Sequence, residues 1–300
     1  TAIYPTTEGI SQQRIRGIIL QALSLMNEHP LIELLPEEFK KSSLAAMLKF
    51  IHKPPNTAPI EQLNKGEHPS QQRLAFEELL AHNLSLLKLR QEVQNHKAPP
   101  LLNKDHLKER FLAALPFQLT GAQKRVSLEV QKDLSKSFPM LRLVQGDVGS
   151  GKTVIAALAA IQCVAAGKQV ALMAPTEVLA EQHRQSFEAW FNPLGIKIGW
   201  ITGKVKGRVR IQQLDAIKDG SAQIVIGTHA LFQKEVSFQD LALTIIDEQH
   251  RFGVHQRLSL KEKGRNDNQI PHQLTMTATP IPRTLAMCAY ADLDCSVIDQ

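Results

Sequence analysis

Two adjacent carboxylates, Asp247 and Glu248, come directly after the apolar and β-branched run at 241–246. Such a run predicts a buried strand, so both acids stand at the carboxyl end of that strand. Carboxylates in this position can hold Mg²⁺ or polarise a water molecule, but they also suit the first turn of a helix. The pair alone leaves both interpretations open.

A phosphate-binding loop is predicted at 146–153, where GDVGSGKT fits the pattern G-x-x-x-x-G-K-[ST]. The loop follows the strand-like segment LRLVQ and precedes an apolar helical stretch from Val154, which is the context that the pattern requires. Backbone N–H groups of such a loop converge on phosphates at a helix N-terminus, where the helix dipole favours anions. We expect the whole loop to bind ATP: Gly146, Asp147, Val148, Gly149, Ser150, Gly151, Lys152 and Thr153.

The loop gives the two acids a partner. We expect Lys152 to neutralise the β and γ oxygens, and Thr153 and Asp247 to hold Mg²⁺. Glu248 is then the candidate base that polarises the attacking water, so Lys152, Asp247 and Glu248 form the candidate catalytic set. The alternatives are a glycine-rich turn with a solvated Lys152 and an acidic helix cap.

A candidate adenine-binding segment, FQLTGAQKR, lies just before the first strand. A glutamine amide can pair with both N6 and N7 of adenine, so Gln123 is expected to select ATP, with Phe117 stacking on the base. Thr120 and Gln123 also form a T-x-x-Q capping box. Both roles are compatible, because a cap would fix the same side chain.

Composition narrows the class of protein. The 300 residues are 43% hydrophobic and carry a net charge of +6, which favours a folded protein with a polyanionic partner. The three cysteines form no C-x-x-C pair, so we expect neither disulfides nor a zinc ribbon, and a reducing cytoplasm. The longest apolar stretch, VIAALAAIQCVAA, is too short to span a membrane. Because residue 1 is Thr, we expect a longer parent chain.

Two regions with different periodicities must position these residues. Residues 1–115 have helical spacing, with a helix from Ser11 and a long helix capped by Ser70 that ends near His96. Residues 116–300 alternate helical stretches with nearly continuous apolar strands, which is typical of an open α/β parallel sheet with helices on both faces. The expected strands are LRLVQ, QVALMA, IKIGWIT, QIVIGT, LALTIID and HQLTMTAT.

A resemblance to a known family rests on six segments in order: FQLTGAQ, GDVGSGKT, APTEVLAEQH, GTHAL, DEQH and TATPIPRTL. They resemble the Q motif and motifs I, Ia, Ib, II and III of superfamily 2 helicases. Within that superfamily, DEQHRFGVHQR and MTATPIPRTLAM are similar to RecG branch-migration helicases. The resemblance implies that 116–300 is the first RecA-like P-loop NTPase domain and that 1–115 is the helical connector that follows a wedge domain.

The resemblance also implies roles for residues outside the P-loop. Contacts with the DNA backbone are expected at Pro175, Thr176, Gly203, Gly227, Thr228 and His229. Coupling between nucleotide and DNA is expected from Gln249, His250, Thr277 and Thr279. The basic stretch KVKGRVR at 204–210 is either a further DNA contact or a solvated face. A zinc site formed by Asp247, His250 and His255 is disfavoured, because a turn between the histidines does not place them on one helix face.

The activity implied is that of an ATP-dependent helicase, acting on branched or forked DNA in repair and recombination, at stalled forks and Holliday junctions. Two alternatives stay open: a duplex translocase of transcription-coupled repair, and a nucleotide-gated DNA-binding module without turnover. The protein is expected to be a bacterial, nucleoid-associated monomer. Only a short tail follows motif III, so the second RecA-like domain and the wedge domain are expected elsewhere in the parent chain. Without them, we expect the 300-residue chain to bind ATP·Mg²⁺ weakly, without turnover or unwinding.

Overall fold

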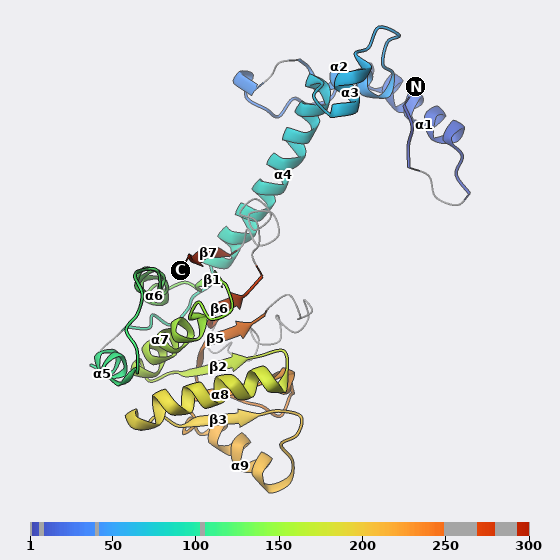
Figure 1. The fold of residues 1–300 in the computed structure, drawn as a ribbon. Coiled ribbons are helices and arrows are strands. Elements are labelled where there is room, and N and C mark those ends of the chain that lie inside the picture. Colours follow the sequence, from blue (N-terminus) through green and yellow to red (C-terminus); the bar gives the residue numbers. More distant parts are fainter. Residues whose placement is uncertain are drawn as a thin grey trace. The chain divides into compact units, whose positions relative to one another are not determined.

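The computed structural model describes residues 2–5, 9–39, 42–102, 106–248, 269–279 and 293–299. The chain divides into two compact units, Thr1–Ser85 and Leu86–Gln300. The division falls inside the long helix α4 (Pro69–Gln94), shown in Figure 1.

The first unit is helical, as the spacing of its apolar residues predicts. It contains α1 (Gln12–Leu25), η1 (Glu37–Phe39), α2 (Leu44–His52), α3 (Ile60–Lys65) and the first part of α4. The helix expected from Ser11 is present, and Ser11 caps α1 because its hydroxyl accepts from the N–H of Arg14 over 3.3 Å. Buried Arg73 of α4 forms ion pairs with Glu33 and Glu77.

The start of α4 differs from the sequence prediction. Ser70 lies in the first turn instead of capping the helix, which begins at Pro69. The fixed φ of proline suits a first helical position. The N–H of Ser70 donates to Nδ1 of His68 over 3.2 Å, so the preceding histidine satisfies one of the N–H groups that a helix leaves free at its start.

The second unit is built on a seven-stranded parallel sheet with the order β3-β4-β2-β5-β6-β1-β7. The six expected strands are present and confirm the α/β prediction: β1 (Leu141–Gly146), β2 (Gln169–Met173), β3 (Ile198–Ile201), β4 (Ile224–Gly227), β5 (Leu241–Asp247) and β6 (His272–Thr277). The seventh, β7 (Asp294–Ile298), pairs with β1 at the edge of the sheet and was not predicted.

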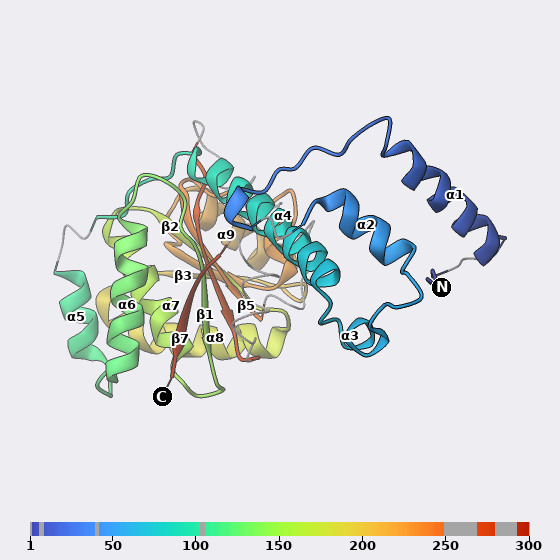
Figure 2. The same ribbon diagram turned by 90° about the horizontal axis from the view of Figure 1, so that it is seen from above.

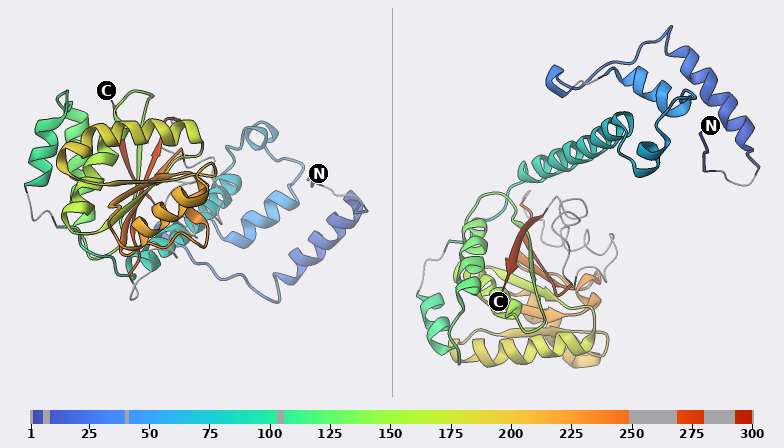
Figure 3. Two further views of the ribbon diagram at one scale, coloured as in Figure 1. Left: turned by 90° about the horizontal axis from the view of Figure 1, so that it is seen from below. Right: turned by 45° about the horizontal axis from the view of Figure 1, so that its top comes forward.

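Helices cover both faces of the sheet, as can be followed in Figures 2 and 3. They are α6 (Gly121–Leu134), α7 (Lys152–Ala165), α8 (Glu177–Phe191) and α9 (Gly207–Lys218). The unit also contains α5 (Leu107–Ala114) and the short turns η2 (Asn192–Leu194) and η3 (His229–Phe232). Alternate residues of β2 enter opposite cores: Val170 and Leu172 pack with α6, α7 and α8, whereas Ala171 and Met173 pack with α9. This is the period of two that a strand imposes.

Helix α5 lies before the predicted boundary at 115/116, yet it packs on α7 and α8 of the second unit. Its Phe111 is fully buried in the core formed by α6, α7 and α8. Of the helices in the described ranges, none is long and apolar enough to cross a membrane.

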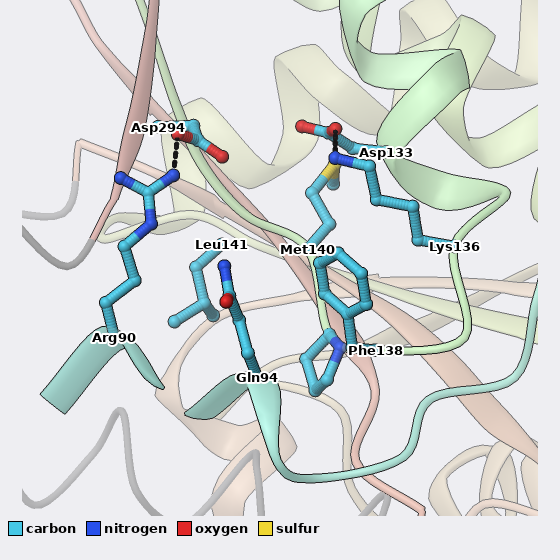
Figure 4. Close-up of a pocket in the computed structure, with 9 residues that line it drawn as sticks. Arg90, Gln94, Asp133, Lys136, Phe138, Met140, Leu141 and Asp294 are labelled. Carbon is cyan, nitrogen blue, oxygen red and sulfur yellow. Dashed lines mark hydrogen bonds and ion pairs between the residues drawn. The ribbon is translucent and has the colours of Figure 1, made fainter. Parts of the chain in front are cut away.

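A charged cluster closes the amino end of β1, where Figure 4 shows a small pocket. Arg142 of β1 donates to Asp133 of α6 and, over 2.6 Å, to the hydroxyl of Ser296 in β7. Burial alone would raise the pKa of the Asp133 carboxyl, but hydrogen bonds from Lys136 and Arg142 outweigh it and hold the pKa below its usual range. The cluster therefore ties the edge strand to α6, at the end of the sheet opposite the P-loop.

His272, the first residue of β6, is fully buried at this same end. Its Nδ1 accepts from the N–H of Met140 over 3.0 Å, and its Nε2 donates to the carbonyl of Pro99 over 2.9 Å. These two bonds fix the neutral tautomer that carries its proton on Nε2. Burial lowers the pKa of His272 to about 4, since a charged imidazole would lose its hydration.

Candidate functional site

The candidate site lies at the carboxyl edge of three neighbouring strands, in the order β5, β6, β1. The register places Asp247 of β5 opposite Met276 of β6, and Thr277 of β6 opposite Gln145 of β1. The P-loop, motif III and the two acids therefore emerge side by side. This is the edge at which open parallel sheets bind ligands.

The P-loop turns through two glycines in the left-handed region, Gly149 at φ 85° and Gly151 at φ 90°. The ammonium of Lys152 donates to the carbonyls of Gly146 over 2.6 Å and Asp147 over 2.8 Å. The hydroxyl of Ser150 is buried and has no hydrogen-bond partner among the described residues. An ammonium bound to its own loop, an unpartnered hydroxyl and the start of α7 together fit a phosphate chain.

Electrostatics connect the P-loop with the two acids. Burial lowers the pKa of Lys152, and the negative charges of Asp247, Glu248 and Asp147 oppose that effect. The structure thus brings the lysine and both candidate acids into one electrostatic environment. The roles assigned to them, and to half-buried Thr153 in metal binding, stay predictions.

Asp247 is held by a residue that the sequence analysis did not single out. Its Oδ2 lies 2.7 Å from Nε2 of His183 in α8, and both side chains are buried. His183 belongs to a buried helical stripe with Ala180 and Phe187. A polar residue on an otherwise apolar stripe was the signal available in the sequence.

Glu248 contacts the motif III segment that follows β6. Its N–H donates to the carbonyl of Met276 over 2.9 Å, and its Oε1 accepts from the N–H of Ala278 over 3.1 Å. Among the described non-glycine residues, Glu248 alone has a positive φ, of 51°. Left-handed backbone costs about 1 kcal/mol or more for such a side chain, and conformations of this kind cluster at active sites and ligand-binding segments.

Of the four residues predicted to couple nucleotide and DNA, Thr277 and Thr279 are among the described residues. The hydroxyls of Thr277 and Thr279 lie 2.8 Å apart, and the N–H of Thr279 donates to Oγ1 of Thr277 over 3.2 Å. These bonds shape the same segment that binds Glu248. Gln249 and His250 lie outside the described residues.

The T-x-x-Q capping box is confirmed at the start of α6, because the side chains of Thr120 and Gln123 each bond the other's backbone N–H. The amide of Gln123 also donates to the carbonyl of Ser150 in the P-loop over 2.9 Å. Phe117 is 43% exposed and packs edge-to-face on Trp190 of α8, with ring centroids 6.2 Å apart. Binding of adenine by Gln123 and Phe117 stays a prediction.

The predicted DNA contacts occupy the other half of the same edge, after β2, β4 and β3. Thr176, Gly203 and His229 are exposed there, and Pro175 is half-buried. Thr228 is buried, and its hydroxyl has no partner among the described residues. Gly227 has a structural reason to be glycine, since a Cβ there would lie 2.0 Å from the carbonyl oxygen of Ile201.

The basic stretch at 204–210 is partly structural. Arg210 donates to the carbonyls of Thr202 and Val205 and pairs with Glu235, so its charge stabilises the loop after β3. Lys204 pairs with Glu177 over 2.5 Å. His250 and His255 of the disfavoured zinc site lie outside the described residues, within which no group of three metal-ligating side chains occurs.

A family model described as "DEAD/DEAH box helicase" matches residues 122–288. Two curated relatives described as "ATP-dependent DNA helicase RecG" match the whole chain: that of Haemophilus influenzae with 59% identity and that of Escherichia coli K12 with 58%. The chain spans 44% of the length of each of these relatives. The resemblance to RecG helicases that the motifs predict is therefore confirmed over all 300 residues.

Among solved structures, one described as "Structure of RecG bound to three-way DNA junction" is 37% identical, with a TM-score of 0.73. The likeness covers 99% of this chain and 39% of that one. A helicase described as MrfA bound to DNA is 20% identical, with a TM-score of 0.52 over 68% of this chain, which supports the fold alone.

Proposed function

The chain belongs to the DEAD/DEAH box helicase family, and from this premise we propose that it forms the ATP-binding part of an ATP-driven motor that remodels branched DNA. One observation carries the proposal: the neighbouring strands β5, β6 and β1 bring Asp247, Glu248 and the P-loop with Lys152 to the same edge of the sheet. A cation, two acids and a phosphate-binding loop are the parts that phosphoryl transfer to water requires.

Each of these residues has a distinct task. Lys152 would exchange its bonds to the loop carbonyls for phosphate oxygens, and the P-loop N–H groups would bind the same phosphates. Thr153 and Asp247 would hold Mg²⁺, which when bound neutralises charge on the β and γ oxygens. Glu248 would orient and polarise the attacking water. Its bond to the N–H of Ala278 supports a link between this step and motif III.

Branched DNA, such as a stalled fork or a Holliday junction, is the proposed substrate. The RecG structure of 37% identity is described as bound to a three-way DNA junction, which supports this class of DNA. In this chain, the exposed loops after β2, β3 and β4 would contact the DNA backbone. Contacts of this kind position DNA without reading its sequence.

We propose further that turnover requires a second RecA-like domain. Motors of this kind take from it an arginine that stabilises charge on the γ-phosphate, worth about 10³ to 10⁵ in rate. For the 300 residues alone, we therefore expect binding of ATP·Mg²⁺ with negligible phosphate release. A protein that carries the chain together with a second RecA-like domain should release phosphate faster when forked DNA is added.

The test has two measurements on the purified chain: binding of a fluorescent ATP analogue with and without Mg²⁺, and phosphate release with and without forked DNA. Lys152→Ala serves as the control that lacks the P-loop cation. If the wild-type chain binds the nucleotide no better than this variant, the nucleotide site is refuted. DNA-stimulated turnover of the chain alone, lost in Glu248→Gln, would instead refute only the need for a second domain. Nucleotide binding without turnover even beside that domain would favour the nucleotide-gated module.

A further inference from the structure

His183 makes a buried contact that the proposed roles do not explain. Its Nε2 lies 2.7 Å from Oδ2 of Asp247, and each residue is 8% exposed. They are 64 positions apart in sequence and belong to different elements, the helix α8 and the strand β5. The contact therefore exists only because the fold places α8 over the end of β5.

The donor and the acceptor of the hydrogen bond between His183 and Asp247 can be assigned. An ionised carboxylate only accepts hydrogen bonds, so the proton lies on Nε2 of His183 and is donated to Oδ2. Among the described residues, His183 provides the hydrogen bond that Asp247 accepts through its side chain, and that bond uses Oδ2. Oδ1 is then the oxygen left to face the water shell of a metal ion.

The helix that carries His183 is well fixed. Thr176 caps α8 by accepting from the N–H of Leu179 over 3.3 Å, and Phe187, one turn beyond His183, is fully buried. A donor on such an element holds its partner in one rotamer, and a buried hydrogen bond is not weakened by competing water. Without this bond, only packing around the buried Asp247 would restrict its side-chain torsions.

We propose that His183 is a positioning residue, which orients the Asp247 carboxylate so that the nucleotide site binds Mg²⁺. This inference rests on the proposed function, since it needs Asp247 to serve the metal. Residues that hydrogen-bond to metal-binding side chains typically contribute about 10-fold to 100-fold to metal affinity. A purely structural histidine would instead contribute to the stability of the fold and leave the metal requirement unchanged.

The experiment compares two substitutions of similar size in the 300-residue chain. His183→Phe keeps a ring but removes the N–H, whereas His183→Gln keeps an N–H at a similar reach. The matched control is Gln185→Ala, because Gln185 is exposed on the same helix and its side chain bonds only Glu181 of α8 among the described residues. A fluorescent ATP analogue is bound in EDTA, and then at a fixed concentration while Mg²⁺ is titrated. Thermal melting is recorded for each variant.

For His183→Phe, we expect the Mg²⁺ concentration at half-saturation to rise about 10-fold or more, with the nucleotide affinity in EDTA unchanged. His183→Gln should recover most of that loss, and Gln185→Ala should match the wild type. If His183→Phe does not fold, His183→Asn takes its place, because its shorter amide does not reach Oδ2.

Two results would overturn the inference. In the first, His183→Phe melts at a lower temperature but needs no more Mg²⁺ than the wild type, which shows a structural role alone. In the second, its nucleotide affinity in EDTA falls as much as its Mg²⁺ affinity, which shows a damaged P-loop. The proposed function fails separately, if the wild-type chain binds the nucleotide no better than Lys152→Ala.

Discussion

Replacing Gln123 separates two roles that share one amide group. In the structure, Oε1 accepts from the N–H of Thr120 over 3.0 Å, and Nε2 donates to the carbonyl of Ser150 over 2.9 Å. Gln123→Ala removes both hydrogen bonds. At about 1 kcal/mol for each bond, we expect the free energy of unfolding to fall by about 2 kcal/mol. For a domain of this size that corresponds to a decrease in melting temperature of about 4–8 °C.

Gln123→Glu keeps the acceptor for the N–H of Thr120 but places a carboxylate oxygen against the carbonyl of Ser150. We therefore expect the cap at the start of α6 to survive and the contact with the P-loop to be lost. If Gln123 also pairs with adenine, both variants lose discrimination between ATP and GTP, by about 1–3 kcal/mol, which is about 5-fold to 150-fold in relative affinity.

The assay combines thermal melting with competition titrations of ATP and GTP, and the exposed Gln118 supplies the control Gln118→Ala. A lower melting temperature with unchanged selectivity would refute adenine binding and leave the capping box as the sole role. An unchanged melting temperature in Gln123→Ala would refute the energetic reasoning itself, because two observed hydrogen bonds would then contribute nothing.

Three further predictions concern the site and its support. Lys152→Ala should abolish binding of ATP·Mg²⁺ in a nucleotide titration, because only Lys152 is expected to bind phosphate in the ground state. Glu248→Gln should retain this binding but block hydrolysis in a protein that also carries a second RecA-like domain. Equal loss of nucleotide affinity in the two variants would refute this division of roles. The free energy of unfolding of the wild type should fall by up to about 3 kcal/mol as the pH falls from 7 towards 4, because His272 is protonated near pH 6.5 in the unfolded chain and only near pH 4 in the folded chain. Denaturant titrations at several pH values should show a weaker dependence of this free energy on pH for His272→Gln. An equal dependence in the variant would exclude His272 as the cause. Gly227→Ala should destabilise the fold by more than about 1 kcal/mol, since its Cβ would meet the backbone of β3; unchanged melting would show that the strands separate without cost.

The sequence predicts best those elements whose signal is local. Six strands were found because strands covered on both faces are nearly continuous apolar runs. The edge strand β7 was missed because two polar residues, half-exposed Asp294 and buried Ser296, interrupt its apolar residues, so it lacks the continuous apolar run of the other strands. Ser70 was wrongly predicted as a cap because the serine signal is common, whereas capping by the ring nitrogen of His68 is not.

The candidate site shows the same limit. The P-loop and the capping box are each formed by residues close together in the sequence, so the spacing of residue types is enough to predict them. The contact of His183 with Asp247 depends on how α8 lies over β5, which no spacing along the chain specifies. Likewise, the bond from Ala278 to Glu248 follows from the pairing of β5 with β6.

The left-handed backbone at Glu248 sets stability against activity at one position. A non-glycine residue with a φ of 51° costs the folded state about 1 kcal/mol or more. Glycine would adopt this conformation without that cost, but it would lack the carboxylate that reaches Ala278 and is proposed to polarise water. Selection for thermostability alone would therefore favour glycine at this position. If Glu248 polarises water as proposed, its retention exchanges some folding stability for turnover.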